Sequence, residues 1–112
     1  MVGDEAELSV APHLAALGFD LVYQSRGSRG VFDLLALRGP AQLGIQVTRS
    51  PLPLRFKRSE WNRMQADAER WGWRWTIAAV TDDGAVHILD PSRARHAREI
   101  RLDDDAIIPN VL

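Results

Sequence analysis

The stretch GVFDLLALRGPAQLGIQVTR, residues 30–49, decides the fold. Its two apolar runs, residues 31–37 and 42–48, are separated by Arg38-Gly39-Pro40-Ala41. Apolar runs of this length are typical of strands, and the Gly-Pro pair cannot continue a β ladder because proline has no amide hydrogen to donate. The stretch therefore predicts a β-hairpin.

This hairpin carries polar groups where apolar ones would be expected. Asp33 is a lone carboxylate among the apolar residues of the first strand. Gln46 and Thr48 share one face of the second strand, because side chains alternate along a strand. A carboxylate embedded in a buried strand is costly unless it is paired, hydrogen-bonded or bound to a metal. Neighbouring strands would bring Asp33 and Gln46 close together.

Metal-assisted phosphodiester hydrolysis is one explanation, because hard oxygen ligands can hold a divalent ion that polarises a phosphate and activates water. Two structural explanations remain open. Asp33 could cap a turn or pair with Arg26 or Arg29, and Gln46 with Thr48 could be a polar pair on a half-exposed strand.

The rest of the chain supplies helices and further strands. Helical periodicity predicts a first helix over residues 4–18, ended by Gly18, and a second from Ser59 as N-cap to about Trp71, ended by Gly72. An apolar stripe of four residues marks the second helix: Trp61, Met64, Ala68 and Trp71. Further strands are expected over residues 19–24, 74–81 and 86–89, and a helical turn from Pro91 onward.

These elements predict an α/β fold in the order αβββαββ. A helix between the third and fourth strands lets those strands lie parallel, so we expect a mixed central sheet of about five strands flanked by helices. No linker or repeat divides residues 1–112, which indicates one domain. Its core is expected over about residues 4–89, with a C-terminal tail over residues 90–112. The apolar end of this tail, residues 106–112, either packs back on its own domain or acts as a dimer strap.

Composition narrows the class of protein. Of the 112 residues, 46% are hydrophobic and 26% are charged, which is ordinary globular usage. The absence of cysteine excludes disulfides, thiolate metal sites and cysteine nucleophiles. No apolar run approaches membrane-spanning length and no signal peptide is evident, so a cytoplasmic protein without membrane contact is expected.

Basic residues concentrate in the middle of the chain although the net charge is only −1. One cluster of basic residues contains Arg49, Arg55, Lys57, Arg58 and Arg63. Arginine suits bidentate phosphate contacts, but a basic face is equally often just solvated surface.

A resemblance to a known superfamily is carried by the hairpin. Gly30-x-x-Asp33-Leu34-Leu35-Ala36, followed 13 residues after Asp33 by Gln46 within Ile45-Gln46-Val47, resembles the PD-(D/E)XK nuclease signature. The wider pattern is similar to the archaeal Holliday-junction resolvases. Glu7 stands 11 residues before Gly18-Phe19, and Ser28 lies in a Ser-Gly loop before the strand aspartate.

This resemblance implies a restriction-endonuclease-like core and a role for each matched residue. Asp33 would be the main ligand of Mg²⁺ or Mn²⁺, Gln46 the second ligand through its carbonyl oxygen, and Glu7 a distal or water-mediated contributor. Ser28 would bind or orient a phosphate. The implied phosphate-contacting set is Arg26, Ser28, Arg29, Arg49, Arg55, Lys57, Arg58 and Arg63.

The chain departs from the superfamily pattern at one position. The motif has a lysine two residues after the second ligand, and Thr48 stands there. Threonine has no charge with which to stabilise a phosphorane-like transition state. Lys57 lies on the approach to the second helix and is the candidate to reach back into the site.

The function implied by the resemblance is that of a metal-dependent endonuclease on branched or structured DNA, in repair or recombination. A homodimer is implied as well, because a junction presents two symmetric strands. No small-molecule cofactor is expected. Two alternatives stay open: a catalytically inactive nuclease-fold module that binds DNA or a partner protein, and a small subunit of a larger nuclease or restriction complex.

Overall fold

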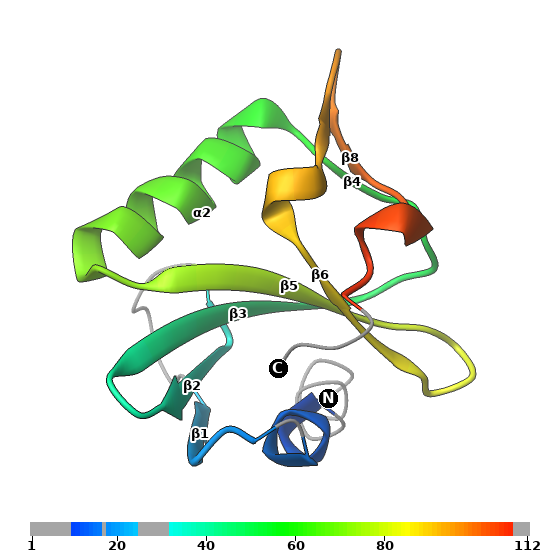
Figure 1. The fold of residues 1–112 in the computed structure, drawn as a ribbon. Helices are drawn as coiled ribbons and strands as arrows, with labels where there is room; N and C mark the ends of the chain where they lie inside the picture. The colour runs from blue at the N-terminus through cyan, green and yellow to red at the C-terminus, as the bar shows by residue number, and fades with distance from the viewer. Residues whose placement is uncertain (1–9, 17, 25–31, 109–112) are drawn as a thin grey trace.

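A five-stranded sheet in the order β1-β2-β3-β5-β6 lies at the centre of the computed structural model, which describes residues 10–16, 18–24 and 32–108 (Figure 1). β3 pairs parallel with β5, and the other neighbours pair antiparallel. The strands are β1 (Leu21–Gln24), β2 (Leu34–Arg38), β3 (Ala41–Arg49), β5 (Arg74–Val80) and β6 (Val86–Leu89). The predicted hairpin, the mixed sheet and its parallel pair are confirmed.

Helices cover the two faces of this sheet (Figure 1). Residues 10–16 are helical and pack on one face, while α2 (Arg58–Trp71) lies over the other. Because side chains alternate along a strand, the buried residues of the sheet divide into two clusters, one on each face. Ile45 packs with Val10 and Leu14, whereas Ile77 and Ala79 pack in the cluster that contains α2.

Glycines end both helices, as predicted. The Gly18 N–H donates to the Ala15 carbonyl at 3.1 Å, with φ 97° at Gly18. The Gly72 N–H donates to the Glu69 carbonyl at 3.2 Å, with φ 70°, a left-handed value that glycine adopts without a Cβ penalty. The predicted N-cap at Ser59 is wrong. Lys57 occupies the N-cap of α2 and makes no side-chain capping bond.

A second, three-stranded sheet in the order β4-β8-β7 was not predicted. It joins β4 (Leu54–Phe56), β8 (Ile100–Leu102) and β7 (Arg95–His96), and the 3₁₀ turns η1 (Pro91–Arg93) and η2 (Asp104–Ala106) flank its C-terminal strands. The turn expected from Pro91 is thus confirmed as η1. The segment predicted as a tail packs back on the core: Ile100, Leu102 and Ala106 are buried, and Ile107 bridges to Leu89.

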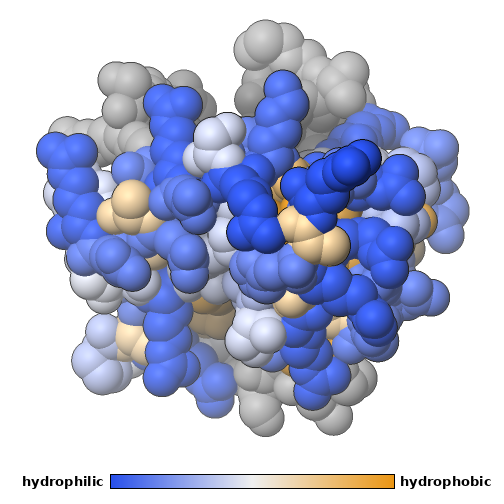
Figure 2. All heavy atoms as spheres, turned by 90° about the horizontal axis from the view of Figure 1, so that it is seen from above, coloured by the Kyte–Doolittle hydropathy of each residue, from blue (hydrophilic) through white to orange (hydrophobic). Residues whose placement is uncertain are grey.

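Ion pairs compensate like charges on this small sheet. Arg101 lies opposite both Arg55 and Arg95 in the ladders. Arg55 pairs with Glu99 at 3.4 Å, and Asp103 accepts from Arg95 at 2.9 Å and from Arg101 at 3.2 Å. The view from above, onto α2 and the small sheet, shows hydrophilic side chains with only small separate apolar patches (Figure 2).

The predicted apolar stripe of α2 is correct except at its last residue. Trp61, Met64 and Ala68 are buried, but Trp71 is 45% exposed. Trp71 stacks on Trp73, with ring centroids 5.9 Å apart, instead of entering the core, because α2 ends at this residue and Gly72 turns the chain toward β5. None of the helices in the described ranges is long and apolar enough to cross a membrane.

Candidate functional site

Asp33 lies at a bend immediately before β2, so its predicted position inside the strand is wrong by one residue. Its backbone N–H donates to the Ile45 carbonyl at 2.9 Å, and its Oδ2 accepts the backbone N–H of Val47 at 2.9 Å. The side chain thus takes a ladder position that a main-chain carbonyl would occupy if β2 continued. Because Leu34 pairs with Ile45, the next position along the ladder sets Asp33 beside Gln46.

The Asp33 carboxyl is half-buried, and this raises its pKa above the ordinary value of 3.8. Burial is the main cause, because removing water penalises the charged form, and the Val47 N–H opposes the shift. Among the described residues no basic side chain forms an ion pair with Asp33; the suggested partners Arg26 and Arg29 lie outside those residues. A buried carboxylate with one hydrogen bond retains acceptor capacity for a cation.

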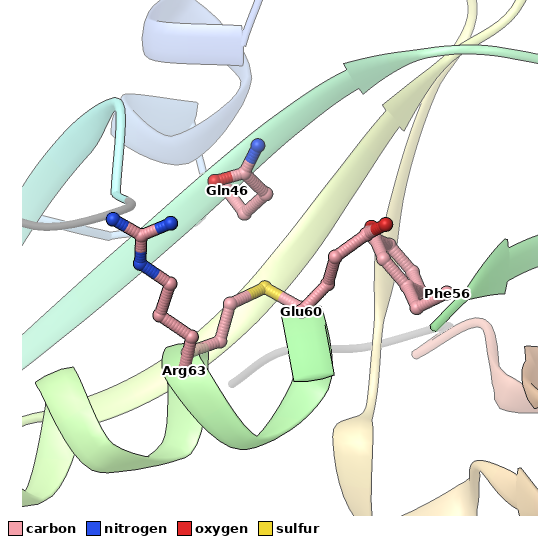
Figure 3. Close-up of a pocket in the computed structure, with 5 residues that line it drawn as sticks. Gln46, Phe56, Glu60 and Arg63 are labelled. Carbon is pink, nitrogen blue, oxygen red and sulfur yellow. The ribbon is translucent and has the colours of Figure 1, made fainter. Parts of the chain in front are cut away.

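Gln46 presents an unsatisfied oxygen. Its Oε1 is buried and has no hydrogen-bond partner among the described residues. Buried polar atoms are paired in the large majority of cases, so an exception asks for an explanation such as a missing ion or water. Gln46 extends from β3 into the space between the sheet and α2 (Figure 3), where it lines a pocket of about 170 Å³ together with Phe56, Glu60, Arg63 and Met64.

Thr48 and Lys57 lie nearby but do not line this pocket. Thr48 is half-buried opposite Ala79 in the parallel ladder and, by alternation, is on the same face as Gln46. Lys57 is exposed, and its carbonyl accepts the Trp61 N–H at 3.0 Å at the start of α2. Their catalytic roles stay predictions. Glu7 and Ser28 lie outside the described residues.

Two charged residues of α2 complete the pocket, and one of them was missed. Arg63 was predicted only as a phosphate contact, and Glu60 was not singled out at all. The available signal was their spacing: positions three apart on a helix point to one side. The sequence alone did not indicate what this side of the helix contacts; the structure shows that it lines a pocket with Gln46.

The predicted basic cluster is exposed, and some of its members are already engaged. Arg49, Arg55, Lys57, Arg58 and Arg63 all lie at the surface. Arg58 donates to the Ala97 carbonyl at 2.6 Å, and Arg55 is paired with Glu99. Ligands that reach these two residues must therefore compete with existing contacts.

The donor set fits a divalent cation. Within the described residues there is no group of three or more histidine or acidic side chains able to hold a metal. The Asp33 carboxylate and the orphaned Gln46 oxygen are nevertheless two hard oxygen donors at neighbouring ladder positions, the ligand type that Mg²⁺ and Mn²⁺ prefer.

Comparison with solved structures decides the fold family. The 1.6 Å resolution structure of Archaeoglobus fulgidus Hjc, a Holliday junction resolvase from an archaeal hyperthermophile, matches with a TM-score of 0.76 at 21% sequence identity. The match covers 95% of this chain and 87% of that chain. The chain has the fold of Hjc. No protein-family model and no curated protein matches it.

The Hjc-like fold confirms the resemblance predicted from the hairpin motif and the predicted α/β class. At this level of identity the match establishes the architecture, and the chemistry must be argued from the residues of this chain.

Proposed function

We propose that this protein binds branched or structured DNA and hydrolyses its phosphodiesters with the help of Mg²⁺ or Mn²⁺. The observation that carries the proposal is the buried, unpartnered Oε1 of Gln46 beside the half-buried carboxylate of Asp33. Both features are unfavourable for folding alone, and both are relieved by one cation held between oxygen donors. The Hjc-like fold supports the choice of DNA as substrate.

In this proposal Asp33 and Gln46 hold the cation, and Glu7 contributes from a distance or through water. The Val47 N–H fixes one oxygen of Asp33, so the other oxygen is the one offered to the ion. When bound, the ion supplies Lewis-acid polarisation of the phosphate and lowers the pKa of a bound water. The backbone of β3 orients both ligands, because Val47 and Gln46 are consecutive in it.

DNA binding is proposed for the basic surface. Arg49, Arg55, Lys57, Arg58 and Arg63 would contact backbone phosphates, together with Arg26, Ser28 and Arg29. Arg55 and Arg58 would do so after giving up their contacts to Glu99 and Ala97. Such contacts give affinity without sequence specificity and weaken as salt rises.

Thr48 favours a second candidate function, a binding module without cleavage. An uncharged side chain at the motif lysine position removes an electrostatic contribution to catalysis. Such a module would bind DNA or a partner protein, alone or as a small subunit of a larger nuclease complex.

A nicking assay on supercoiled DNA and on four-way junctions, with Mg²⁺ or Mn²⁺, tests the proposal. We expect metal-dependent cleavage that is lost in Asp33→Asn. Salt-dependent junction binding without cleavage would select the binding module. If the wild-type protein neither cuts nor binds DNA, the nuclease and the DNA-binding module are both wrong, and only the module that binds a partner protein is left.

A homodimer is part of the proposal, because two equivalent cuts on a junction require two sites related by a two-fold axis. Sedimentation of the free protein and of its junction complex measures the stoichiometry. Two chains per junction are expected, and a single chain per junction would contradict the paired-cut geometry.

A further inference from the structure

The pocket between β3 and α2 brings one buried unsatisfied atom and two exposed charged residues to the same space. Among the described residues Gln46 Oε1 has no hydrogen-bond partner, and Glu60 and Arg63 line the same pocket of about 170 Å³. In Figure 3 the guanidinium of Arg63 lies on the Gln46 side and the carboxylate of Glu60 lies beside Phe56. In the figure Arg63 extends from α2 toward the strand that carries Gln46. A liquid water molecule occupies roughly 30 Å³, so this pocket has room for a partly hydrated ion or a phosphate oxygen.

Glu60 and Arg63 do not form an ion pair with each other. Glu60 and Arg63 are three positions apart on α2, a spacing at which opposite charges commonly pair. Within the described part of the chain neither side chain forms an ion pair or a hydrogen bond. Trp61 and Met64 are buried toward the sheet, which fixes the rotation of α2 and holds Glu60 and Arg63 on the flank of its buried face.

Arg63 lines this pocket from α2, across from Gln46 of β3. A lysine at position 48 would project from the Gln46 face of β3 toward α2, because side chains alternate along the strand. Thr48 is too short and carries no charge, while Arg63 brings a guanidinium from α2 to the pocket beside Gln46. Guanidinium stays charged at all relevant pH values and binds phosphate oxygens in a bidentate manner.

Glu60 compensates for the neutral ligand. With Gln46 as a ligand in place of a carboxylate, Asp33 is the one proposed direct ligand that carries a negative charge, against the two positive charges of a divalent ion; the proposed role of Glu7 is distal or water-mediated. A carboxylate at the Gln46 pocket restores a second negative charge and a further hard oxygen donor, directly or through water.

From these contacts we propose that α2 supplies the charged groups that β3 lacks: Arg63 binds the substrate phosphate at the cation site, and Glu60 is an additional carboxylate donor for the divalent ion. The inference rests on the proposed function and adds to it the part of the site formed by a helix. A guanidinium offers hydrogen-bond donors and no acceptor, so the role of Arg63 is binding and charge stabilisation and not activation of water.

Separate measurements of metal and DNA binding test the two residues. Mn²⁺ binding to the DNA-free protein is followed by electron paramagnetic resonance of free Mn²⁺, and junction binding by fluorescence anisotropy in EDTA. Glu60→Gln is expected to weaken Mn²⁺ binding at least tenfold and to leave junction affinity in EDTA equal or higher. Arg63→Ala is expected to weaken junction binding at least tenfold, with Mn²⁺ binding equal or tighter, and Arg63→Lys to recover part of the loss.

Matched controls remove equal charges elsewhere. Glu69→Gln lies on α2 away from the pocket, and Arg98→Ala removes an exposed arginine near β8. If Glu60→Gln and Arg63→Ala behave like these controls while Asp33→Asn abolishes Mn²⁺ binding, the inference is wrong and the proposed function stands. If the wild-type protein binds neither Mn²⁺ nor junction DNA, both fall.

Discussion

The Oδ2 atom of Asp33 accepts the backbone N–H of Val47 at 2.9 Å, so the proposed metal ligand also closes the ladder between β2 and β3. A structural and a chemical role therefore share one carboxyl group, and substitutions can separate them. Asn keeps an acceptor oxygen for Val47, whereas Ala leaves a partly buried N–H without a partner.

We expect Asp33→Ala to lower the free energy of unfolding by about 1–3 kcal/mol, the usual cost of an unsatisfied buried group, and Asp33→Asn by less than about 1 kcal/mol. Both should lose Mn²⁺ binding. Urea unfolding and Mn²⁺ titration measure the two effects. Equal destabilisation by both variants would show that the Val47 contact contributes nothing.

The raised pKa of Asp33 sets a pH dependence in metal-free buffer. Because the folded chain holds this proton more tightly than the unfolded chain, the contribution of Asp33 to the free energy of unfolding is full below about 3.8 and is lost as pH rises through the higher pKa of the folded state. The stability of wild type relative to Asp33→Asn should therefore fall with rising pH above 3.8. Urea unfolding of both proteins between acidic and neutral pH checks this. If the free energy of unfolding of wild type rises with pH relative to that of Asp33→Asn, the prediction is contradicted.

Gln46 is expected to lower the stability of the metal-free protein and to contribute to Mn²⁺ binding. Gln46→Leu removes the orphaned oxygen, so the metal-free protein should be as stable as wild type or more stable by about 1 kcal/mol, while Mn²⁺ binding is lost. Gln46→Glu adds a second buried charge near Asp33, so it should destabilise the metal-free protein and tighten Mn²⁺ binding. Thermal unfolding with and without Mn²⁺ measures both. A Leu variant that still binds Mn²⁺ would remove Gln46 from the site.

Gly44 allows Phe32 to pack against β3. A Cβ at residue 44 would lie 2.9 Å from Cδ2 of Phe32, whose ring is held between Trp73 and Trp75 at 6.3 and 6.2 Å. Gly44→Ala should destabilise the fold by about 1–3 kcal/mol through overpacking. The double variant with Phe32→Leu should recover part of that loss. Strictly additive free energies from urea unfolding would show that the two residues do not clash.

Thr48→Lys tests whether the site lacks only a charge. Thr48 is half-buried on the Gln46 face, so a long side chain can extend toward α2. Because Arg63 is proposed to supply the missing charge from α2, we expect cleavage of four-way junctions in Mg²⁺ to rise less than tenfold, with the unfolding midpoint changed by only a few degrees. A rise of tenfold or more in a folded Thr48→Lys variant would contradict the supply of this charge by α2.

The elements that depend on neighbouring residues could be predicted from the sequence. Alternation and the Gly-Pro break are sufficient to define the hairpin of β2 and β3, and the glycines at positions 18 and 72 define where helices end. These signals lie within a few residues of the structure that they specify. The prediction of Ser59 as N-cap was wrong because a residue type gives only a statistical preference for capping. The packing of Trp61 and Met64 sets the start of α2 at Arg58.

Long-range features were beyond such signals. β4 has only three residues, and its partner β8 lies far along the chain, so no local pattern announces either strand. Glu60 is exposed on a helix like many ordinary glutamates. Its relation to Gln46 exists only once α2 lies over β3, which depends on the packing of the entire core.

The pairing of Leu54 with Leu102 also has a consequence for how the protein matures. α2, β5 and β6 all lie in sequence between these two residues, so β4 stays without its neighbour until residues 100–102 have been synthesised. Phe56, at the end of β4, forms one wall of the Gln46 pocket. The pocket wall at Phe56 therefore cannot be completed before β8 has left the ribosome, so metal binding should be acquired only after the central sheet can form.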